Sequence, residues 1–422
     1  MSGTVHIVGL GVAGLSAAVR LADAGREVKL YDGAKVAGGR CRSFHDAKLD
    51  CLIDNGNHLL LSGNKSALSY LDLLGARHEL EIADEATFPF YDHESKERWA
   101  VTLDKGLIPW WVFQKSRSIP GVRLSEFASA LKFPFASAKA TIESLTGKTG
   151  KLFERFWEPM TWAVLNTTPD RASAKLMWAV FAETFAKGGT YCKPMIAKRG
   201  LSETFVDPAL TFLETKDVEP QFNIPLKEIE TNNGLVTSLH LGDDVITLGK
   251  QDSVVLAVPR AQAARLASDS SIPDGDTAIV NAHFKMADGW SADNAPPLLG
   301  LVNSKTHWIF TRGNIISLTI SAADALGLDR LSEDELLPQL WDEVVAALDL
   351  PTNTSYEAGR LIRERRATFD QSPESVAKRP DTKTDLANLC LAGDWTNTGV
   401  PATIEGSIRS GELAAEAVLS WR

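Results

Sequence analysis

Residues 5–32 read VHIVGLGVAGLSAAVRLADAGREVKLYD. The apolar run 5–8 predicts a buried parallel strand, and the spacing of apolar residues from Val12 onward predicts a helix. Between them stand Gly9, Gly11 and Gly14 in G-x-G-x-x-G spacing. Gly9 permits a tight turn, Gly11 allows a pyrophosphate to approach the backbone, and Gly14 allows the helix to pack closely on the strand. The stretch therefore predicts a βαβ unit that binds a dinucleotide.

Two further features of this unit predict contacts with the ligand. The N–H groups of Val12 and Ala13 lie at the positive end of the predicted helix, where phosphates bind. Asp32 follows the second strand, 18 positions after Gly14. A carboxylate at this place accepts hydrogen bonds from ribose hydroxyls and disfavours a 2′-phosphate.

The C-terminal residues 391–418, LAGDWTNTGVPATIEGSIRSGELAAEAV, predict the other half of the same site. A short strand ends at Gly393 and Asp394, and a long helix begins near Thr403 and Ile404. Asp394 can accept from ribityl hydroxyls, and the N–H groups at the start of the helix can bind a flavin carbonyl. The two ends together favour FAD over NAD.

Gly38, Gly39 and Arg40 follow the first acidic residue directly. This GGR resembles a phosphate-side motif of the FAD-dependent amine oxidase and carotenoid desaturase superfamily, which implies that Arg40 lies near the pyrophosphate. We also expect contacts with the cofactor from Asn57 and Leu226. The mixed α/β pattern predicts a Rossmann-like FAD-binding domain with a discontinuous substrate domain of mixed sheet and helices.

The domain boundaries follow from the order of these patterns. The FAD-binding domain is predicted to comprise residues 1–80, 200–265 and 386–422. The substrate-binding domain is predicted to comprise residues 81–199, a helical and aromatic block, and residues 266–385. Strands are expected at 222–226, 234–241, 253–258, 278–284, 298–302 and 315–320, and a helix with a capping box at 332–348.

Composition narrows the functional classes. The formal net charge is −10 and no basic domain compensates for it, which argues against a nucleic-acid partner. The four cysteines form no C-x-x-C pair, so no cysteine-based metal site and no metal cofactor are expected. No signal peptide is expected, because the glycine motif interrupts the first apolar stretch, and no run of about 18 apolar residues is present. A cytoplasmic chain is expected.

Four internal segments carry a narrower resemblance: IDNGNHLLLSGN (53–64), FWEPMTWAVLNTTPDRASA (156–174), KRGLSETFVDPAL (198–210) and RERRATF (363–369). With the C-terminal motif, they resemble the hydroxysqualene dehydroxylases, squalene-associated FAD-dependent enzymes of bacterial hopanoid synthesis, over nearly the whole chain. The resemblance implies that hydroxysqualene loses its allylic hydroxyl and takes a hydride from reduced flavin N5, which gives squalene. One departure is Asp32, where the superfamily usually carries Glu.

The implied reaction needs a proton for the leaving hydroxide and a cavity without competing water. The acid candidates are His58, Asp54, Asn166 and Glu183, polar residues set in apolar surroundings. Each also has a structural interpretation, such as a hydrogen bond in the core, a turn cap or a solvated helix face. The arginines between 360 and 366 either surround the site or alternate along an exposed strand.

Aromatic residues gather in two stretches and suggest a membrane contact. Leu107 to Phe113, with Trp110 and Trp111, form an apolar stretch followed by Lys115 and Arg117. Such a stretch suits a monotopic contact through which an isoprenoid reaches the site. We therefore expect a peripheral position on the inner face of the cytoplasmic membrane. The second stretch, with Phe153, Phe156, Trp157, Trp162 and Trp178, lines either a cavity or an ordinary core.

Two other functions fit parts of the sequence. An oxidative carotenoid desaturase or amine oxidase would share the fold, although Thr368-Phe369 gives little sign of the aromatic cage of amine oxidases. A non-catalytic isoprenoid-binding escort protein would not need complete FAD motifs at both ends. No second G-x-G-x-x-G follows a strand, so electrons for the flavin are expected from an external donor.

Overall fold

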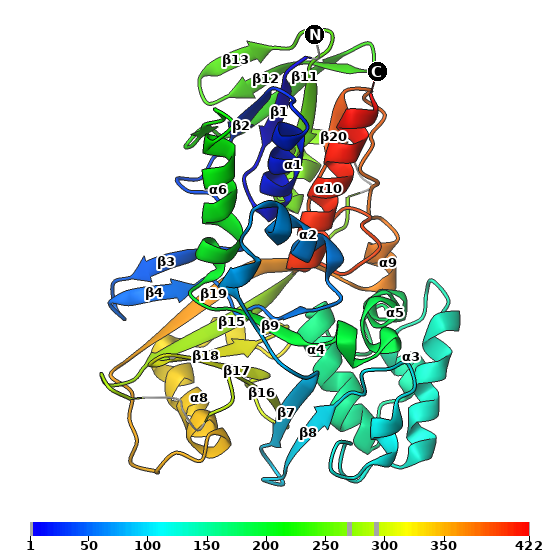
Figure 1. Ribbon diagram of the computed structural model, residues 1–422, viewed down its shortest axis with the longest axis vertical. Helices are drawn as coiled ribbons and strands as arrows, with labels where there is room; N and C mark the ends of the chain where they lie inside the picture. Colours follow the sequence, from blue (N-terminus) through cyan, green and yellow to red (C-terminus); the bar gives the residue numbers. More distant parts are fainter. Residues whose placement is uncertain (1–2, 268–271, 291–294, 422) are drawn as a thin grey trace.

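The computed structural model describes residues 3–267, 272–290 and 295–421, and these residues form two lobes (Figure 1). The upper lobe in Figure 1 holds a five-stranded parallel sheet in the order β10-β2-β1-β14-β20. Its strands are β1 (Val5–Val8), β2 (Val28–Tyr31), β10 (Pro220–Gln221), β14 (Ser253–Leu256) and β20 (Leu389–Leu391). The carboxyl ends of all five strands lie at the same edge of the sheet. Ligands bind at this edge in sheets of this kind.

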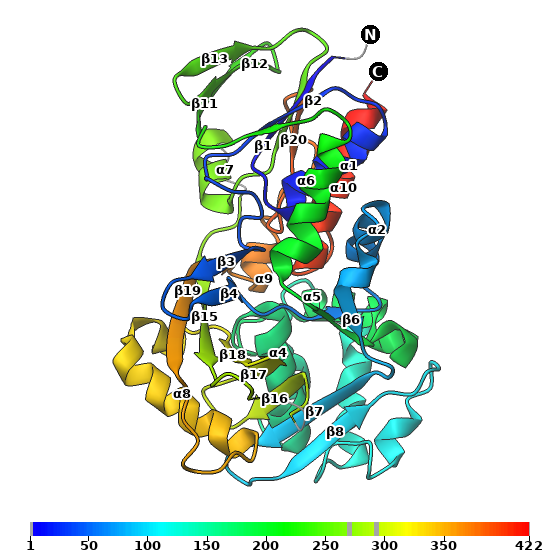
Figure 2. The same cartoon turned by 60° about the vertical axis from the view of Figure 1, so that its left-hand side comes forward.

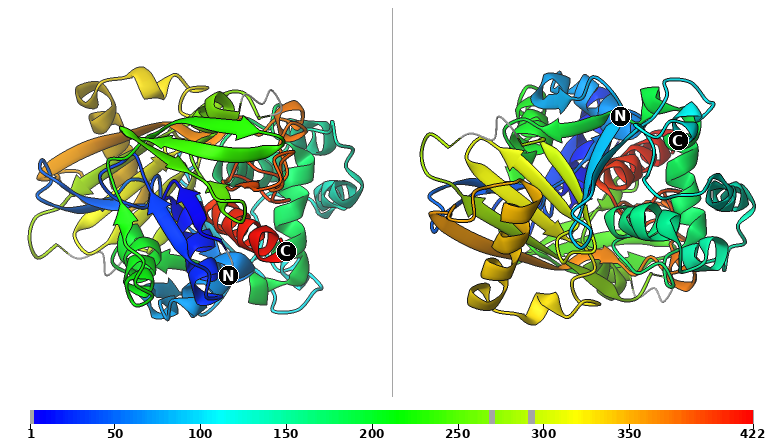
Figure 3. Two further views of the ribbon diagram at one scale, coloured as in Figure 1. Left: turned by 90° about the horizontal axis from the view of Figure 1, so that it is seen from above. Right: turned by 90° about the horizontal axis from the view of Figure 1, so that it is seen from below.

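Helices from both ends of the chain cover this sheet. Helix α1 (Val12–Asp23) lies beside α10 (Ile404–Ser420), and Figure 3 shows α10 in red against the blue N-terminal elements. The hydroxyl of Ser16 donates to the carbonyl of Ile408 over 2.9 Å, and Arg20 pairs with Glu412 at 3.1 Å. The N- and C-terminal motifs therefore build one lobe.

The lower lobe holds a seven-stranded sheet in the order β19-β15-β18-β17-β16-β7-β8. Its strands are β7 (Thr87–Asp92), β8 (Arg98–Thr102), β15 (Asp276–Lys285), β16 (Leu298–Val302), β17 (Trp308–Arg312), β18 (Ile315–Ile320) and β19 (Ala358–Phe369). Helix α8 (Glu333–Ala347) packs on one face, against residues such as Val280, Phe284 and Leu318. On the other face, α4 (Glu158–Leu165) and α5 (Ala174–Glu183) pack near β7, β8 and β16 (Figure 2).

Smaller elements join the two lobes. The hairpin β3 (Ser43–Asp46) and β4 (Cys51–Asp54) lies between them, as does the sheet of β5 (Leu60–Leu61), β9 (Pro194–Ala197) and β6 (Leu80–Ile82). The remaining elements are β11 (Leu226–Asn232), β12 (Leu235–Leu241), β13 (Asp244–Thr247), α2 (Lys65–Leu73), α3 (Ile142–Thr146), α6 (Asp207–Glu214), α7 (Arg260–Ala267) and α9 (Pro373–Val376), together with short turns of 3-10 or π helix.

Most predicted elements occur near their predicted positions, and two expectations were wrong. The strand expected at 222–226 is irregular backbone up to residue 225, and β11 begins only at Leu226, after Pro225. The block 81–199 is not wholly helical, since β7 and β8 from it extend the seven-stranded sheet. The capping box of α8 is present: Ser332 accepts from the N–H of Glu335, and the Glu335 carboxylate accepts from that of Ser332.

Candidate functional site

The glycine-rich turn leaves room for a ligand in front of its backbone. A Cβ at Gly11 would meet no atom within 4 Å, apart from its chain neighbours. At Gly14 the same atom would lie 1.9 Å from the carbonyl oxygen of Gly9, and at Gly9 it would lie 2.4 Å from that of Ala257. Gly9 also has φ +100°, which disfavours any side chain. Glycine is therefore required at Gly9 and Gly14 by packing, while at Gly11 it keeps space open.

Asp32 closes the turn from the end of β2. Its carboxylate accepts from the N–H of Leu10 over 2.6 Å and from that of Ala34 over 2.7 Å. These bonds fix the side chain at the carboxyl edge of the sheet, beside the glycine turn. The position fits an acceptor for ribose hydroxyls.

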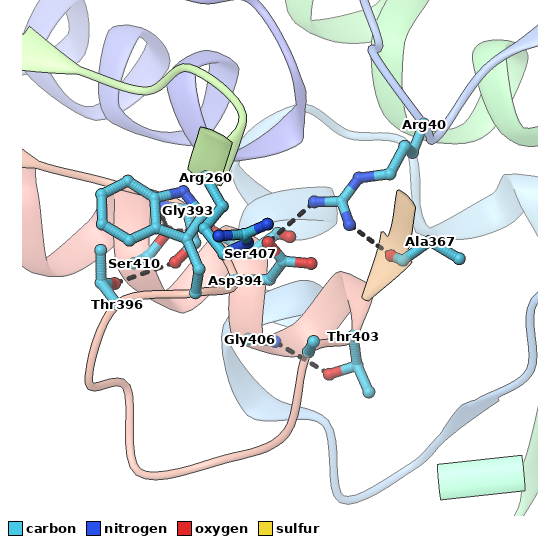
Figure 4. A network of polar contacts seen from close by, with 12 residues as sticks. Arg40, Arg260, Ala367, Gly393, Asp394, Thr396, Thr403, Gly406, Ser407 and Ser410 are labelled. Atoms are coloured by element: carbon cyan, nitrogen blue, oxygen red, sulfur yellow. Dashed lines mark hydrogen bonds and ion pairs between the residues drawn. The ribbon is translucent and has the colours of Figure 1, made fainter. Parts of the chain in front are cut away.

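Arg40 connects the turn to the C-terminal motif (Figure 4). Its guanidinium pairs with the carboxylate of Asp394 at 2.7 Å and also donates to the carbonyl of Ala367. Gly38 forms a bridge with Gly11, and a Cβ at Gly39 would lie 3.4 Å from the Cα of Gly11. The GGR motif therefore lies directly against the glycine-rich turn.

The start of α10 completes this side of the site. The hydroxyl of Thr403 caps the helix by accepting from the N–H of Gly406 over 3.1 Å (Figure 4). The N–H groups of Ile404 and Glu405 precede the first hydrogen bond within the helix, from Ser407 to the carbonyl of Thr403, and can bind an acceptor. Gly411 lets α10 approach α1, because a Cβ there would lie 2.1 Å from the carbonyl oxygen of Ala13.

Comparison with known proteins identifies the family. The family model "Flavin containing amine oxidoreductase" matches residues 12–419. The chain belongs to this family. Hydroxysqualene dehydroxylase from Sinorhizobium fredii is 40% identical over 420 residues, which cover 100% of this chain and 99% of the relative. The chain therefore also belongs to the hydroxysqualene dehydroxylase family.

More distant relatives share the fold. A probable zeta-carotene desaturase from Synechococcus elongatus is 24% identical, with 98% of each chain covered. A solved structure of wild-type putrescine oxidase bound to putrescine superposes with a TM-score of 0.73 at 15% identity, with 100% of both chains covered. The fold class expected from the sequence, a Rossmann-like FAD domain with a mixed substrate domain, is confirmed.

FAD is the cofactor of this amine oxidoreductase, and the residues at the turn fit it. The open space at Gly11 and the free N–H groups of Val12, Ala13 and Gly14 at the start of α1 suit the pyrophosphate. Leu226 is buried in the core, and its carbonyl accepts from the side chains of Gln262 and Arg265. The individual cofactor contacts remain predictions.

His58 is half-buried in the loop between β4 and β5. Neither ring nitrogen forms a hydrogen bond with any residue that the structure describes. Burial lowers the pKa of His58 to about 4; Asp54 opposes this shift and Arg40 adds to it. The ring is therefore neutral at pH 7, and both nitrogens are free to meet a ligand.

The three other acid candidates are held by protein partners. Both carboxylate oxygens of Asp54 are bonded, one to Ser43 at 2.6 Å and the other to Arg312 at 3.0 Å. The amide oxygen of Asn166 accepts from the N–H of Ala322 over 2.6 Å. These partners give Asp54 and Asn166 structural roles at the junctions that they join, while a catalytic role for either stays a prediction.

Glu183 lies in a network at the start of α10. Its carboxylate binds Arg409 through both oxygens, at 2.9 and 2.6 Å. Arg409 also pairs with the buried Glu405 at 2.7 Å, and Glu405 accepts from the N–H groups of Ser66 and Ala67 at the beginning of α2. The network joins α5, α10 and α2, and so connects the helical part of the lower lobe to the flavin-side helix.

A polar array on the seven-stranded sheet was not predicted from the sequence. Asn57 donates to the hydroxyl of Thr319 over 3.1 Å, and that hydroxyl donates to the side-chain oxygen of Asn281 over 2.9 Å. Asn281 in turn donates to the carbonyl of Asn55. On the same face, His283 contacts the hydroxyl of Ser317 at 2.8 Å, and burial lowers its pKa to about 4.

This face of the sheet changes from polar to aromatic across its width. Thr319 pairs with Trp308 on the next strand, Trp308 packs 5.7 Å from Phe90, and Phe90 stacks 5.6 Å from Trp99. Cross-strand partners lie on one face. The polar half therefore lies under the loop that carries Asn57, and the aromatic half lies under α4 and α5.

The two aromatic stretches of the sequence differ in how far their side chains are exposed. Trp157 is 2% exposed and stacks on Phe133 at 4.7 Å, so it is a core residue. Trp110 and Phe113 are 57% and 61% exposed, as the predicted membrane contact requires. Trp111 is only 8% exposed and packs on Phe127, so its place in the exposed stretch was wrong.

Among the arginines of residues 360–366, the structure favours the strand interpretation. Arg360 pairs with Asp46 and Glu333, and Arg363 donates to the carbonyl of Asp329. Arg365 and Arg366 are exposed on β19. These arginines therefore do not form a ring around the site.

A surface cleft of about 540 Å³ lies elsewhere in the lower lobe. It is lined by α4 and the turn after β16, with Trp162, Lys305 and His307 among the lining residues. None of the predicted site residues lines it.

Proposed function

We propose that this chain converts hydroxysqualene to squalene. The allylic C–O bond breaks, the hydroxyl leaves as water after it takes up one proton, and a hydride takes its place. Bound FAD in its reduced form supplies this hydride. Membership of the hydroxysqualene dehydroxylase family supports the proposal, and the polar array beside Asn57 and His58 fits it.

The divided face matches the chemistry of this substrate. Hydroxysqualene is a long hydrocarbon with a single polar group. The aromatic half, with Phe90, Trp99 and Trp308, is packed in the core beneath α4 and α5, so it makes this side of the lobe apolar, as a hydrocarbon substrate requires. The polar half, with Asn281 and Thr319, offers hydrogen bonds at one end. A uniformly apolar surface would not favour one orientation of the substrate.

Asn57 and His58 are the residues that we assign to the hydroxyl. The amide nitrogen of Asn57 is held by Leu318 and Thr319, while its amide oxygen accepts no hydrogen bond from the described residues. The neighbouring ring of His58 is likewise without a partner among them. Asn57 can accept from the substrate hydroxyl while His58 delivers the proton to it. Asn57 was predicted as a cofactor contact, and both assignments place it beside the flavin.

The electron balance requires an external donor. Each turnover uses one hydride and one proton, so two electrons must return to the flavin. The sequence has no second G-x-G-x-x-G after a strand to hold a nicotinamide cofactor. We propose that a separate reductant restores the reduced flavin.

We further propose a peripheral position on the inner face of the cytoplasmic membrane. A C30 isoprenoid partitions into lipid, so the enzyme must collect it there. Among the described residues, no helix is long and apolar enough to cross a membrane. The exposed Trp110 and Phe113 support contact with one leaflet only.

Anaerobic single turnover tests the reaction. Enzyme with chemically reduced flavin is mixed with hydroxysqualene, while flavin absorbance and product are followed together. Squalene should form in step with flavin reoxidation, one for one. Oxidised enzyme that instead becomes reduced by a carotenoid or an amine, without squalene formation from reduced enzyme, would show that the chain is a desaturase or an amine oxidase.

A further inference from the structure

We propose that residues 105–151 form a docking face for a bilayer that contains anionic lipid. The face extends beyond the predicted stretch 107–113 to a second exposed segment, residues 124–135. It deepens the proposed function, since it names the lipid class at which the substrate would be collected.

The first segment exposes large apolar side chains on a firmly held loop. Leu107, Ile108, Trp110 and Phe113 are 72, 56, 57 and 61% exposed. The carboxylate of Asp104 holds the loop by accepting from the N–H of Trp111 over 2.6 Å and by pairing with Arg117 at 2.7 Å. The loop therefore presents these side chains to the outside although it is fixed from within.

The second segment, a 3-10 helix from Leu124 to Phe135, repeats this arrangement. In a 3-10 helix, side chains three residues apart lie above one another. Phe127, Ala130, Phe133 and Ala136 form the packed column. The neighbouring column of Ala128, Leu131 and Pro134 faces outward, and Leu131 is 73% exposed. At the two ends of the segment, Leu124 and Phe135 are 53 and 87% exposed.

The two segments are neighbours, because the buried Trp111 of the first packs edge-on against Phe127 of the second at 5.7 Å. Behind them, Phe133 begins a series of aromatic contacts through Trp157, Phe181 and Phe185 to Phe88 on the seven-stranded sheet. The docking face and the aromatic half of the sheet thus belong to one continuous apolar body.

The charge of this face distinguishes between two candidate partners, a second copy of the chain and an anionic bilayer. With the flanking Asp104 and Glu154 that pair with its Arg117 and Lys151, this face contains eight Lys or Arg and four Asp or Glu, a formal charge of +4, in a chain of −10. Lys105, Lys115, Lys139 and Lys148 are exposed and form no ion pair within the described part of the chain. A second copy docked by symmetry would bring the same positive charge to the contact. An anionic bilayer complements it.

Vesicle sedimentation tests the proposal without any substrate. Holoenzyme is incubated with phosphatidylcholine vesicles or with vesicles that also contain phosphatidylglycerol. Wild type should bind the anionic vesicles at least about tenfold more tightly, and salt should weaken this binding. Leu131→Ser with Phe135→Ser, and separately Trp110→Ser with Phe113→Ser, should each reduce binding about tenfold or more.

Two controls separate docking from damage and from self-association. Val36→Ser with Val245→Ser removes side chains that are 57 and 56% exposed in the upper lobe, and this variant should bind as wild type does. Unchanged vesicle binding by both docking-face variants would overturn the proposal. Equal binding of wild type to neutral and anionic vesicles would also overturn the proposal. The same holds if wild type is a dimer and only the docking-face variants are monomers.

The proposed function is tested separately on substrate in detergent. There, the docking-face variants should turn over hydroxysqualene as wild type does. A chain that docks but never forms squalene would refute the proposed function and leave the docking face intact.

Discussion

At the scale of single residues, His58 makes the delivery of the proton testable. With its pKa lowered to about 4 by burial, the ring is almost entirely neutral at pH 7, but its rare protonated form is a strong acid. If this form delivers the proton, kcat/KM should rise about tenfold for each unit by which the pH is lowered from 8 to 6. Initial rates with reduced enzyme measure this slope.

The variant His58→Ala should lose roughly 10²- to 10⁴-fold in kcat/KM and should also lose the slope. His240→Ala is the matched control, because that histidine lies on β12 and pairs with Glu230. A wild-type profile that is flat from pH 8 to pH 6 would exclude His58 as the acid.

Replacement of Thr319 by valine tests the polar array, because the two side chains have nearly the same shape. Thr319→Val removes the hydroxyl that joins Asn57 to Asn281 and leaves the buried oxygen of Asn281 without its donor. A lost buried partner costs about 1–3 kcal/mol. We expect kcat/KM for hydroxysqualene to fall about tenfold while flavin content stays near that of wild type. An unchanged kcat/KM would remove the array from the site.

Residues whose roles depend on local spacing were predictable, and those that depend on distant partners were not. Gly9, Gly14 and Asp32 belong to one βαβ unit, so their spacing in the sequence predicts that they lie beside one another. Asp54 and Glu183 are held by Arg312 and Arg409, more than 200 positions away. The polar array did leave a local signal, because polar residues alternate with apolar ones at 281 and 283 and at 317 and 319.

At the scale of elements, the contact between α1 and α10 holds the two motifs in one site. Gly411→Ala would place a Cβ 2.1 Å from the backbone oxygen of Ala13, which cannot move without moving α1. We expect a loss of about 1–3 kcal/mol in the free energy of unfolding. FAD should also bind more weakly, because the start of α1 would shift.

Urea unfolding and flavin titration measure the two effects of Gly411→Ala. Gly106→Ala is the control, since a Cβ there would meet no atom within 4 Å, and it should change neither quantity. Equal stability of the Gly411 variant and wild type would mean that the helices can separate at little cost.

The elements also show why sequence patterns were insufficient in the lower lobe. Strands β7 and β8 lie within an aromatic block; β7 pairs with β16, which is more than 200 residues away, and β8 pairs with β7. Their aromatic residues suit strands as well as helices, so the tertiary pairing decides between the two. The cofactor lobe was easier to predict because each strand there adjoins a turn of known chemistry.

At the scale of the whole molecule, buried neutral histidines should make the fold sensitive to acid. His283 and His307 are 1% and 9% exposed, and burial lowers the pKa of each from 6.5 to about 4. The unfolded chain therefore binds protons that the folded chain does not, once the pH falls below about 6.5. Their contribution is fully present above pH 6.5 and is lost as the pH falls to 4, by up to about 3 kcal/mol each.

Such a loss is large beside a typical total stability of about 5–15 kcal/mol. The free energy of unfolding, measured in urea at intervals from pH 7.5 to pH 4.5, should therefore decrease steeply below pH 6.5. His283→Asn with His307→Gln should flatten this decrease, although the variant is less stable at pH 7.5. Replacement of the exposed His45 and His78 should leave the slope unchanged. His6 on β1 of the upper lobe is also buried, and burial lowers its pKa as well, so acid should destabilise both lobes and flavin should be released over the same pH range.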